Sequence, residues 1–157
     1  MEFRLRPMIS CDKLHLMALL RDTAEFEPAE IPVAEEVIDA YLDSPGQYYT
    51  ITVALIKSAI VGYVCFGQTP LTRLTWDIYW MAVANEKRGL GIGKTLLESA
   101  ENAICQAGGK LILVETSSKP SYLNTRRFYL KNGYRRVSRI VDFYDRGDNL
   151  LTFEKRF

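Results

Sequence analysis

Apolar and polar residues in the first half of the chain follow two different periods. Alternation, or runs rich in Val, Ile, Thr and aromatic residues, predicts strands at about residues 2–8, 48–56, 60–67 and 74–83. Apolar residues at helical spacing predict two helices between the first two strands, at about residues 11–23 and 33–43. Only short polar breaks separate the last three strands, which indicates an antiparallel meander.

The second half begins with the best-defined helix of the chain. One face of this helix carries its apolar residues: Ile92, Leu96, Leu97, Ala100, Ala103, Ile104 and Ala107. Gly108 and Gly109 predict its end. A continuously apolar strand, a further helix and two strands joined by a turn follow at about residues 110–116, 122–132, 134–143 and 149–156. This order predicts an α+β fold of about seven strands and about four helices.

Length and composition fit one soluble globular domain. A chain of 157 residues buries roughly two thirds of its unfolded surface on folding. No linker or repeat divides it, so we expect a single domain over residues 1–157. A net charge of +1 argues against a nucleic-acid partner. No apolar run approaches the ~20 residues of a membrane span, and we expect a cytoplasmic protein with no membrane contact.

Cysteine and histidine are too few and too scattered for a metal site. Cys11, Cys65 and Cys105 are widely spaced in apolar surroundings, which predicts reduced, buried thiols without a disulfide. The single histidine, His15, lies in a predicted helix, where we expect a structural role. Neither a metal cofactor nor a Ser-His-Asp triad is therefore expected.

The stretch RGLGIGKT, residues 88–95, places glycines, a lysine and a threonine at the start of the best-defined helix. A P-loop would need glycine where Arg88 stands, and the G-x-G-x-G spacing of the stretch differs from the dinucleotide fingerprint G-x-G-x-x-G. Small residues at a helix N-terminus nevertheless let backbone N–H groups approach an anion. The stretch therefore predicts a phosphate site of another type.

Two motifs together point to one family. The segment VANEKRGLGIGKTLLESA is similar to the signature R/Q-x-x-G-x-G/A, with Arg88, Gly91 and Gly93 at its positions, and RRFYLKNGYRRV is similar to the segment FYxxxGF. With these motifs and this order of elements, the chain resembles the GNAT superfamily of N-acetyltransferases over nearly its whole length. The resemblance implies a mostly antiparallel sheet that is splayed between its fourth and fifth strands, and acetyl-coenzyme A as cosubstrate.

The resemblance assigns the phosphate site to the pyrophosphate of acetyl-coenzyme A. It implies binding by the backbone N–H groups of Arg88, Gly89, Leu90, Gly91, Ile92, Gly93, Lys94 and Thr95. The pantetheine arm would lie along Met81, Ala82 and Val83, and the Val83 N–H would polarise the acetyl carbonyl. The family often has asparagine where Tyr122 stands, so either Asn124 makes that cofactor contact or the contact is lost.

The resemblance also assigns the proton donor to Tyr129. A phenol with a pKa of about 10 can protonate a departing thiolate of comparable basicity. Asp77 and Glu115 are the two candidates for the base that deprotonates the amine, and an amine with a neutral fraction needs neither. Alternation places Asp77 on the same face as Met81 and Val83 only if no bulge intervenes.

The first two helices and the last hairpin are expected to wall the acceptor pocket. Residues 25–31 and 142–148 are acidic and aromatic, which suits a cationic primary amine of a small molecule or a peptide. Thr116 and Ser117 would add hydroxyl donors. Exposed edges of the predicted sheet would allow two copies to pair as a homodimer.

The predicted function is acetyl transfer by direct attack in a ternary complex. Cys65 and Cys105 have no histidine partner for a covalent acyl-enzyme. Two alternatives remain, a coenzyme A-binding sensor without turnover and a nucleotide hydrolase, since LILVE imitates a Walker B strand. Tyr129 and the two candidate bases argue against the sensor, whereas Arg88 and the antiparallel meander argue against the hydrolase.

Overall fold

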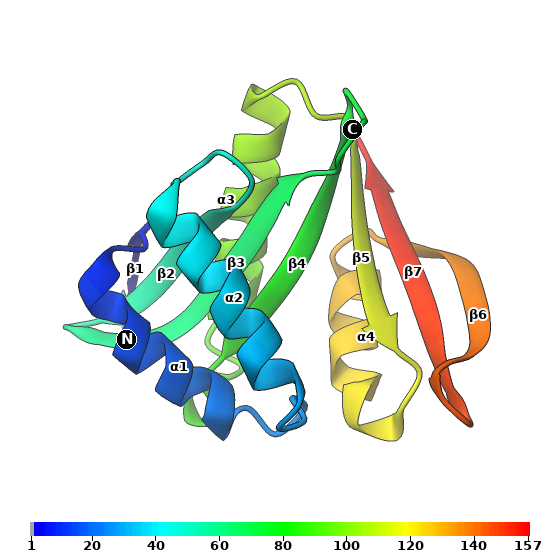
Figure 1. The fold of residues 1–157 in the computed structure, drawn as a ribbon, viewed down its shortest axis with the longest axis horizontal. Coiled ribbons are helices and arrows are strands. Elements are labelled where there is room, and N and C mark those ends of the chain that lie inside the picture. Colours follow the sequence, from blue (N-terminus) through cyan, green and yellow to red (C-terminus); the bar gives the residue numbers. More distant parts are fainter. Residues whose placement is uncertain (1) are drawn as a thin grey trace.

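A seven-stranded mixed sheet forms the centre of the molecule in the computed structural model, which describes residues 2–157. Its strands are β1 (Arg4–Pro7), β2 (Thr50–Ile56), β3 (Ala59–Gln68), β4 (Thr75–Val83), β5 (Leu111–Ser117), β6 (Arg135–Asp145) and β7 (Asp148–Arg156). They are arranged in the order β1-β2-β3-β4-β5-β7-β6 (Figure 1). Neighbouring strands are antiparallel except β4 and β5, which are parallel. The predicted fold class and the antiparallel meander are confirmed.

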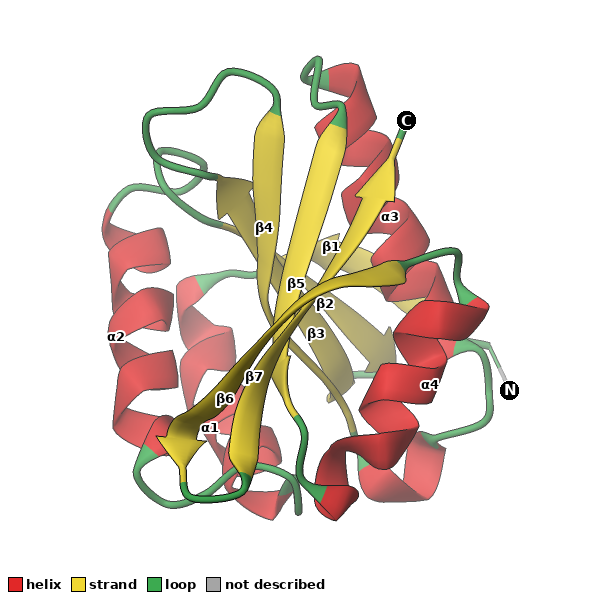
Figure 2. Cartoon of the chain, turned by 90° about the vertical axis from the view of Figure 1, so that its right-hand side faces the viewer, coloured by secondary structure: helices red, strands yellow, loops and turns green. Residues whose placement is uncertain are grey.

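Two pairs of helices cover the two faces of the sheet (Figure 2). α1 (Lys13–Asp22) and α2 (Glu30–Asp43) pack on one face, and α3 (Ile92–Gln106) and α4 (Leu123–Lys131) pack on the other. The core on the first face includes Leu16, Leu20, Ile38, Val53 and Tyr63. The core on the second face includes Leu96, Leu97, Ile104, Ile112 and Phe153. The central strands are therefore covered on both faces, whereas the edge strand β6 is exposed along its whole length.

The helix boundaries agree with the sequence pattern except at the start of α2. This helix begins at Glu30 rather than at about residue 33, and Pro32 lies in its first turn. The first N–H groups of a helix have no intrahelical partner, so a proline there costs no hydrogen bond. α3 begins where predicted, after Gly91, whose φ of 83° is the left-handed conformation that glycine adopts without strain.

The expectation of buried thiols is correct for one cysteine and wrong for two. Cys65 is buried in β3, where its apolar surroundings raise the pKa of the thiol. Cys105 is exposed because it lies on α3 next to Ile104, the residue that turns into the core. Cys11 is exposed in a short 3-10 turn whose buried member is Asp12. His15 is exposed on α1.

The parallel strands β4 and β5 separate part-way along their length. They pair from Thr75 opposite Leu111 to Ile78 opposite Val114, whereas β3 continues beside β4 as far as Val83. Beyond Ile78, the β5-facing edge of β4 has no neighbouring strand in the described part of the chain (Figure 1). This confirms the splay that the resemblance implied.

Tyr79 forms a β-bulge at the point where the splay begins. On β3, Cys65 is opposite Trp80 and Phe66 is opposite Ile78, so Tyr79 has no partner. A bulge shifts the alternation of side chains between the two faces of the strand.

The bulge separates Asp77 from Met81 and Val83. Ile78, Met81 and Val83 pack against the core below α3. Asp77, next to Ile78, therefore points to the opposite face, where Trp80 also packs. The condition under which alternation would place Asp77 beside Met81 and Val83, a strand without a bulge, is therefore not met.

Candidate active site

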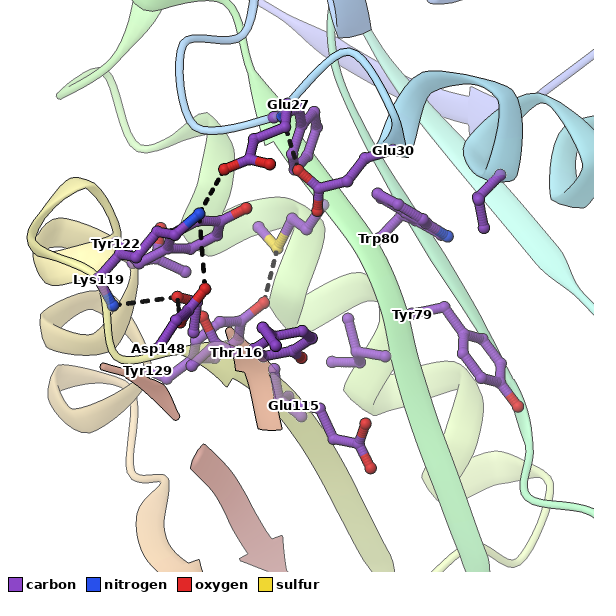
Figure 3. A pocket seen from close by; sticks show the side chains of 18 of the residues that line it. Glu27, Glu30, Tyr79, Trp80, Glu115, Thr116, Lys119, Tyr122, Tyr129 and Asp148 are labelled. Carbon is purple, nitrogen blue, oxygen red and sulfur yellow. Dashed lines mark hydrogen bonds and ion pairs between the residues drawn. The ribbon is translucent and has the colours of Figure 1, made fainter. Parts of the chain in front are cut away.

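Two cavities open into the gap between β4 and β5. The first, of about 690 Å³, lies between the segment that joins α1 to α2, the splayed strands and the β6–β7 turn (Figure 3). The second, of about 550 Å³, lies between the glycine-rich loop, the end of β4 and α4. We call them the acidic cavity and the basic cavity, because their linings carry opposite charge.

The charges of the two linings differ clearly. The acidic cavity is lined by Glu27, Glu30, Asp77, Glu115, Asp145 and Asp148, with Lys119 opposing them. The basic cavity is lined by Lys87, Arg88, Lys94 and Lys131, with Glu25 opposing them. The basic cavity thus favours an anion such as a pyrophosphate, and the acidic cavity favours a cation.

The two cavities meet in the gap between the strands. Their linings share Phe26, Met81, Tyr122, Thr125 and Tyr129. Two ligands that enter from opposite sides would therefore come into contact at these residues.

The glycine-rich loop and the start of α3 form one wall of the basic cavity. Gly89 and Gly91 have φ values of 80° and 83°, so the chain turns sharply before α3. The N-terminus of α3, a helix of 15 residues, then faces the cavity with its free N–H groups. Of the predicted pyrophosphate residues, Leu90 and Thr95 do not line the cavity. Thr95 instead donates its hydroxyl to the Gly91 carbonyl at 3.0 Å.

Arg88 is held by the segment that joins α1 to α2. Its Nη1 and Nη2 donate to Glu25 Oε1 and Oε2 at 2.6 and 2.9 Å, and its Nε donates to the Val83 carbonyl at 3.3 Å. The guanidinium lowers the pKa of the Glu25 carboxyl below its usual value. Arg88 therefore lies at the cavity wall with a carboxylate already bound.

The end of β4 presents unpaired backbone groups to the gap. The Ala84 N–H donates to the Val61 carbonyl at 2.8 Å, which makes the pair Gly62–Val83 a non-hydrogen-bonded one. The N–H groups of Val83 and, two residues earlier, Met81 consequently point away from β3 and into the gap. Met81, Ala82 and Val83 all line the basic cavity, as Asn124 does. An extended ligand could pair with this edge as a strand would.

Tyr129 lies at the junction of the two cavities. Its side chain is 4% exposed, and its hydroxyl contacts the Met81 sulfur at 3.9 Å. Burial raises the pKa of Tyr129 above that of a free phenol. The hydroxyl therefore keeps its proton at neutral pH and can act as a donor.

Both candidate bases line the acidic cavity. The Asp77 carboxylate accepts a hydrogen bond of 2.5 Å from the Thr69 hydroxyl. Glu115 follows Val114, the last residue of β5 that pairs with β4, and its side chain is exposed (Figure 3). The structure thus brings both carboxylates to one cavity and gives only Asp77 a fixed hydrogen-bond partner within the described residues.

The segments expected to wall the acceptor pocket do line the acidic cavity. They contribute Phe26, Glu27 and Ala29 from the segment before α2, Glu30 from the first turn of α2, and Tyr144, Asp145 and Asp148 from the last hairpin. Ser117 also lies there, but it donates its hydroxyl to Asp148. Two ion pairs join the segment before α2 to distant parts of the chain, Glu25 to Arg88 in the glycine-rich loop and Glu27 to Lys119 after β5. They had no signal in the sequence because they connect distant positions.

Two further features concern metal binding and membrane spans. Within residues 2–157 no group of His, Cys, Asp and Glu side chains is arranged to hold a metal ion. None of the helices described here has both the length and the apolar character needed to cross a membrane.

Comparison with known proteins identifies the family. A family model described as "Acetyltransferase (GNAT) domain" matches residues 47–136, which span β2 to the start of β6. The chain belongs to the GNAT acetyltransferase family. An uncharacterized N-acetyltransferase of Methanocaldococcus jannaschii is 33% identical over 116 residues, which cover 71% of this chain and 67% of the relative.

Solved GNAT structures agree with this assignment. A crystal structure described as a GNAT-family acetyltransferase of Desulfovibrio desulfuricans superposes with a TM-score of 0.94 at 31% identity and covers 99% of both chains. The PaiA N-acetyltransferase of Thermoplasma acidophilum, solved with coenzyme A, has a TM-score of 0.76 at 17% identity and covers 100% of both chains. The second likeness concerns the fold alone.

Proposed function

We propose that this GNAT protein is an acetyl-CoA-dependent N-acetyltransferase that acts on a primary amine of a small molecule or peptide by direct attack in a ternary complex. The meeting of the basic and acidic cavities at Tyr129 supports this proposal most directly. A donor bound in the basic cavity and an amine bound in the acidic cavity would lie next to each other there. Coenzyme A in the Thermoplasma relative supports the choice of donor.

The basic cavity fits coenzyme A in charge and in backbone geometry. The pyrophosphate would bind the glycine-rich loop and the N-terminus of α3, with Arg88 and Lys94 adding positive charge. The amides of the pantetheine arm would pair with the open edge at Met81 and Val83, and Asn124 would contact the arm from α4. Acetyl-CoA supplies the activated acetyl group.

Tyr129 is proposed to donate a proton to the departing thiolate. Its buried phenol stays neutral and lies where the cavities meet, so it would hold a proton next to the departing sulfur. The Val83 N–H, which points into the gap, would stabilise the negative charge that develops on the acetyl oxygen. Tyr129 would thus act on the departing sulfur, and the Val83 N–H on the acetyl oxygen.

The proton of the attacking amine needs a separate acceptor. Asp77 and Glu115 both line the acidic cavity and are proposed as alternative general bases, directly or through water. An amine that already has a neutral fraction would need neither. A covalent acyl-enzyme is not part of the proposal, because Cys65 is buried with a raised thiol pKa and does not line either cavity.

Release of free thiol from acetyl-CoA, measured with a panel of amines, peptides and amino acids, tests the function. Amine-dependent release together with the acetylated amine in the mass spectrum would support it. Tight coenzyme A binding without amine-dependent release across the panel would instead indicate a coenzyme A-binding sensor.

A further inference from the structure

The acidic cavity contains more carboxylates than one reacting amine requires. Among the described residues of its lining, Lys119 alone opposes six acidic side chains: Glu27, Glu30, Asp77, Glu115, Asp145 and Asp148. Lys119 is already engaged, because its Nζ contacts Glu27 and lies 3.5 Å from Asp148 Oδ2 (Figure 3). The other four carboxylates have no ion-pair partner within residues 2–157.

The negative potential of these carboxylates disfavours the acetylation of an acceptor with a single amine. The attacking nitrogen must be neutral, whereas nearby carboxylates stabilise its ammonium form and raise its pKa. A strongly acidic cavity therefore lowers the reactive fraction of a simple monoamine. The same field favours an acceptor that carries a second cation, because that group stays charged throughout the reaction.

Part of the cavity lining has the chemistry to hold this second cation. Tyr122 at the start of α4, Tyr144 in β6, Glu30 at the start of α2 and Asp148 at the start of β7 all belong to it. Tyr144, Glu115, Asp148 and Glu30 line the same cavity. Burial raises the pKa of Tyr144, and the negative charges of these carboxylates raise it further. Aromatic rings and carboxylates together bind organic ammonium groups.

An unpaired hydroxyl indicates independently that the cavity takes a polar ligand. Thr116 is 5% exposed, belongs to the lining, and its Oγ1 has no hydrogen-bond partner in the described part of the chain. Buried hydroxyls in proteins are normally hydrogen-bonded, since leaving one unpaired costs free energy. A polar acceptor would supply the missing partner.

We infer that the preferred acceptor carries a second cationic group besides the amine that reacts, and that Tyr122, Tyr144 and Glu30 form the cage that binds it. This inference rests on the proposed function, because it names the acceptor class of the same site. A linear diamine or longer polyamine has this chemistry, and so does a peptide with a basic residue next to its terminal amine.

Matched pairs of acceptors test the inference. One pair is a linear diamine and the monoamine of equal chain length, and the other is a short peptide with lysine or norleucine at its second position. We expect kcat/KM to be at least about 10-fold higher for the dicationic member, and the difference to shrink as salt is added. If the diamine reacts faster than the lysine peptide, the acceptor is a polyamine, and the reverse order indicates a peptide. Equal kcat/KM values within both pairs would overturn the inference.

Two variants connect this preference to the cage. Glu30→Gln removes the charge but keeps an oxygen that can accept the Glu27 N–H, now bonded to Glu30 Oε2 at 2.7 Å. Tyr144→Leu removes the ring. Either change should reduce the ratio of dicationic to monocationic kcat/KM by about 5- to 10-fold, equivalent to about 1–1.4 kcal/mol. Glu36→Gln, an exposed position on α2 outside the cavity lining, is the matched control and should leave the ratio unchanged.

Calorimetry separates failure of the inference from failure of the proposed function. Binding of the diamine and of the monoamine to the protein–coenzyme A complex needs no turnover. Tighter binding of the diamine, weakened by Glu30→Gln, would support the cation cage even if no amine were acetylated. Equal binding of the two, or the same loss in Glu30→Gln and Glu36→Gln, would overturn it.

Discussion

Glu25 holds Arg88 through two hydrogen bonds of 2.6 and 2.9 Å, although the two residues are 63 positions apart in the sequence. The bond connects the segment before α2, which walls the acidic cavity, to the loop at the mouth of the basic cavity. The Glu25 carboxylate is thus bound to the Arg88 guanidinium, the group that the family signature implies would contact the pyrophosphate. Segments that wall the two cavities are therefore joined through one ion pair.

Removing the Glu25 charge should strengthen coenzyme A binding. Glu25→Gln leaves Arg88 unpaired beside an anion site, and an exposed ion pair of this kind changes affinity by about 2- to 5-fold. Arg88→Gln should weaken binding. Isothermal titration with coenzyme A measures both, and Glu36→Gln serves as the control. Weaker binding by Glu25→Gln would show instead that Glu25 positions Arg88.

Replacement of Tyr129 by phenylalanine should remove the proton donor. Because the hydroxyl contacts only the Met81 sulfur among its described neighbours, the ring can stay in place without it. We expect kcat to fall by about 10²- to 10⁴-fold while the Kd for coenzyme A changes less than about 2-fold. Because burial raises the pKa of Tyr129, the wild-type rate should show no decline from its ionisation up to about pH 10. Unchanged turnover at every pH would exclude the donor role.

Asp77→Asn and Glu115→Gln should separate the two candidate bases. A general base must be deprotonated, so the rate rises with pH through the pKa of that base. The variant that lacks the true base should lose this rise and about 10²- to 10⁴-fold in kcat, whereas the other should keep it. Full pH profiles of kcat/KM decide between them. If both variants keep the rise, the amine reacts without either carboxylate.

Gly67 is expected to tolerate no side chain. A Cβ at this position in β3 would overlap the backbone oxygen of Tyr48, which cannot move aside as a side chain could. Gly67→Ala should therefore lower the free energy of unfolding by about 1–3 kcal/mol in urea titrations. At Gly93 in α3, a Cβ meets its nearest atom at 3.5 Å, an ordinary contact. Gly93→Ala should raise the free energy of unfolding by about 0.5–1 kcal/mol. Equal changes in Gly67→Ala and Gly93→Ala would refute the steric explanation.

Asp12 should make the free energy of unfolding depend on pH in the acid range. Arg6 Nη1 and Nη2 donate to its carboxylate at 2.6 and 2.9 Å and lower the pKa of Asp12 against the opposing effect of burial. Because the folded pKa lies below the unfolded one, the contribution is fully present above about pH 4 and is lost as pH falls through the folded pKa.

Arg6→Met tests this contribution. It should lower the free energy of unfolding by about 1.5–3 kcal/mol at pH 7, and the difference from the wild type should narrow below about pH 4. Chemical denaturation across pH 2.5–7 provides the measurement. A difference that stays constant with pH would contradict the assignment.

The sequence by itself determined the elements and the turn of the glycine-rich loop. Periodicity located β4, α3 and the last hairpin within a few residues, because burial of an apolar face leaves a local pattern. The glycines at 89 and 91 were recognisable for a similar reason, since a left-handed turn before a helix needs residues without a Cβ. The family signature then connected that loop to a cofactor class.

Only the tertiary structure decided which side chains meet. The bulge at Tyr79 placed Asp77 on the face opposite Met81, and a bulge depends on the neighbouring strand rather than on the local sequence. The exposure of Cys105 followed from the rotation of α3 on the sheet. The pairs Glu25–Arg88 and Glu27–Lys119, and the junction of the cavities at Tyr129, arise because folding joins segments that are distant in the sequence. Long-range contacts of this kind leave no periodicity in the sequence.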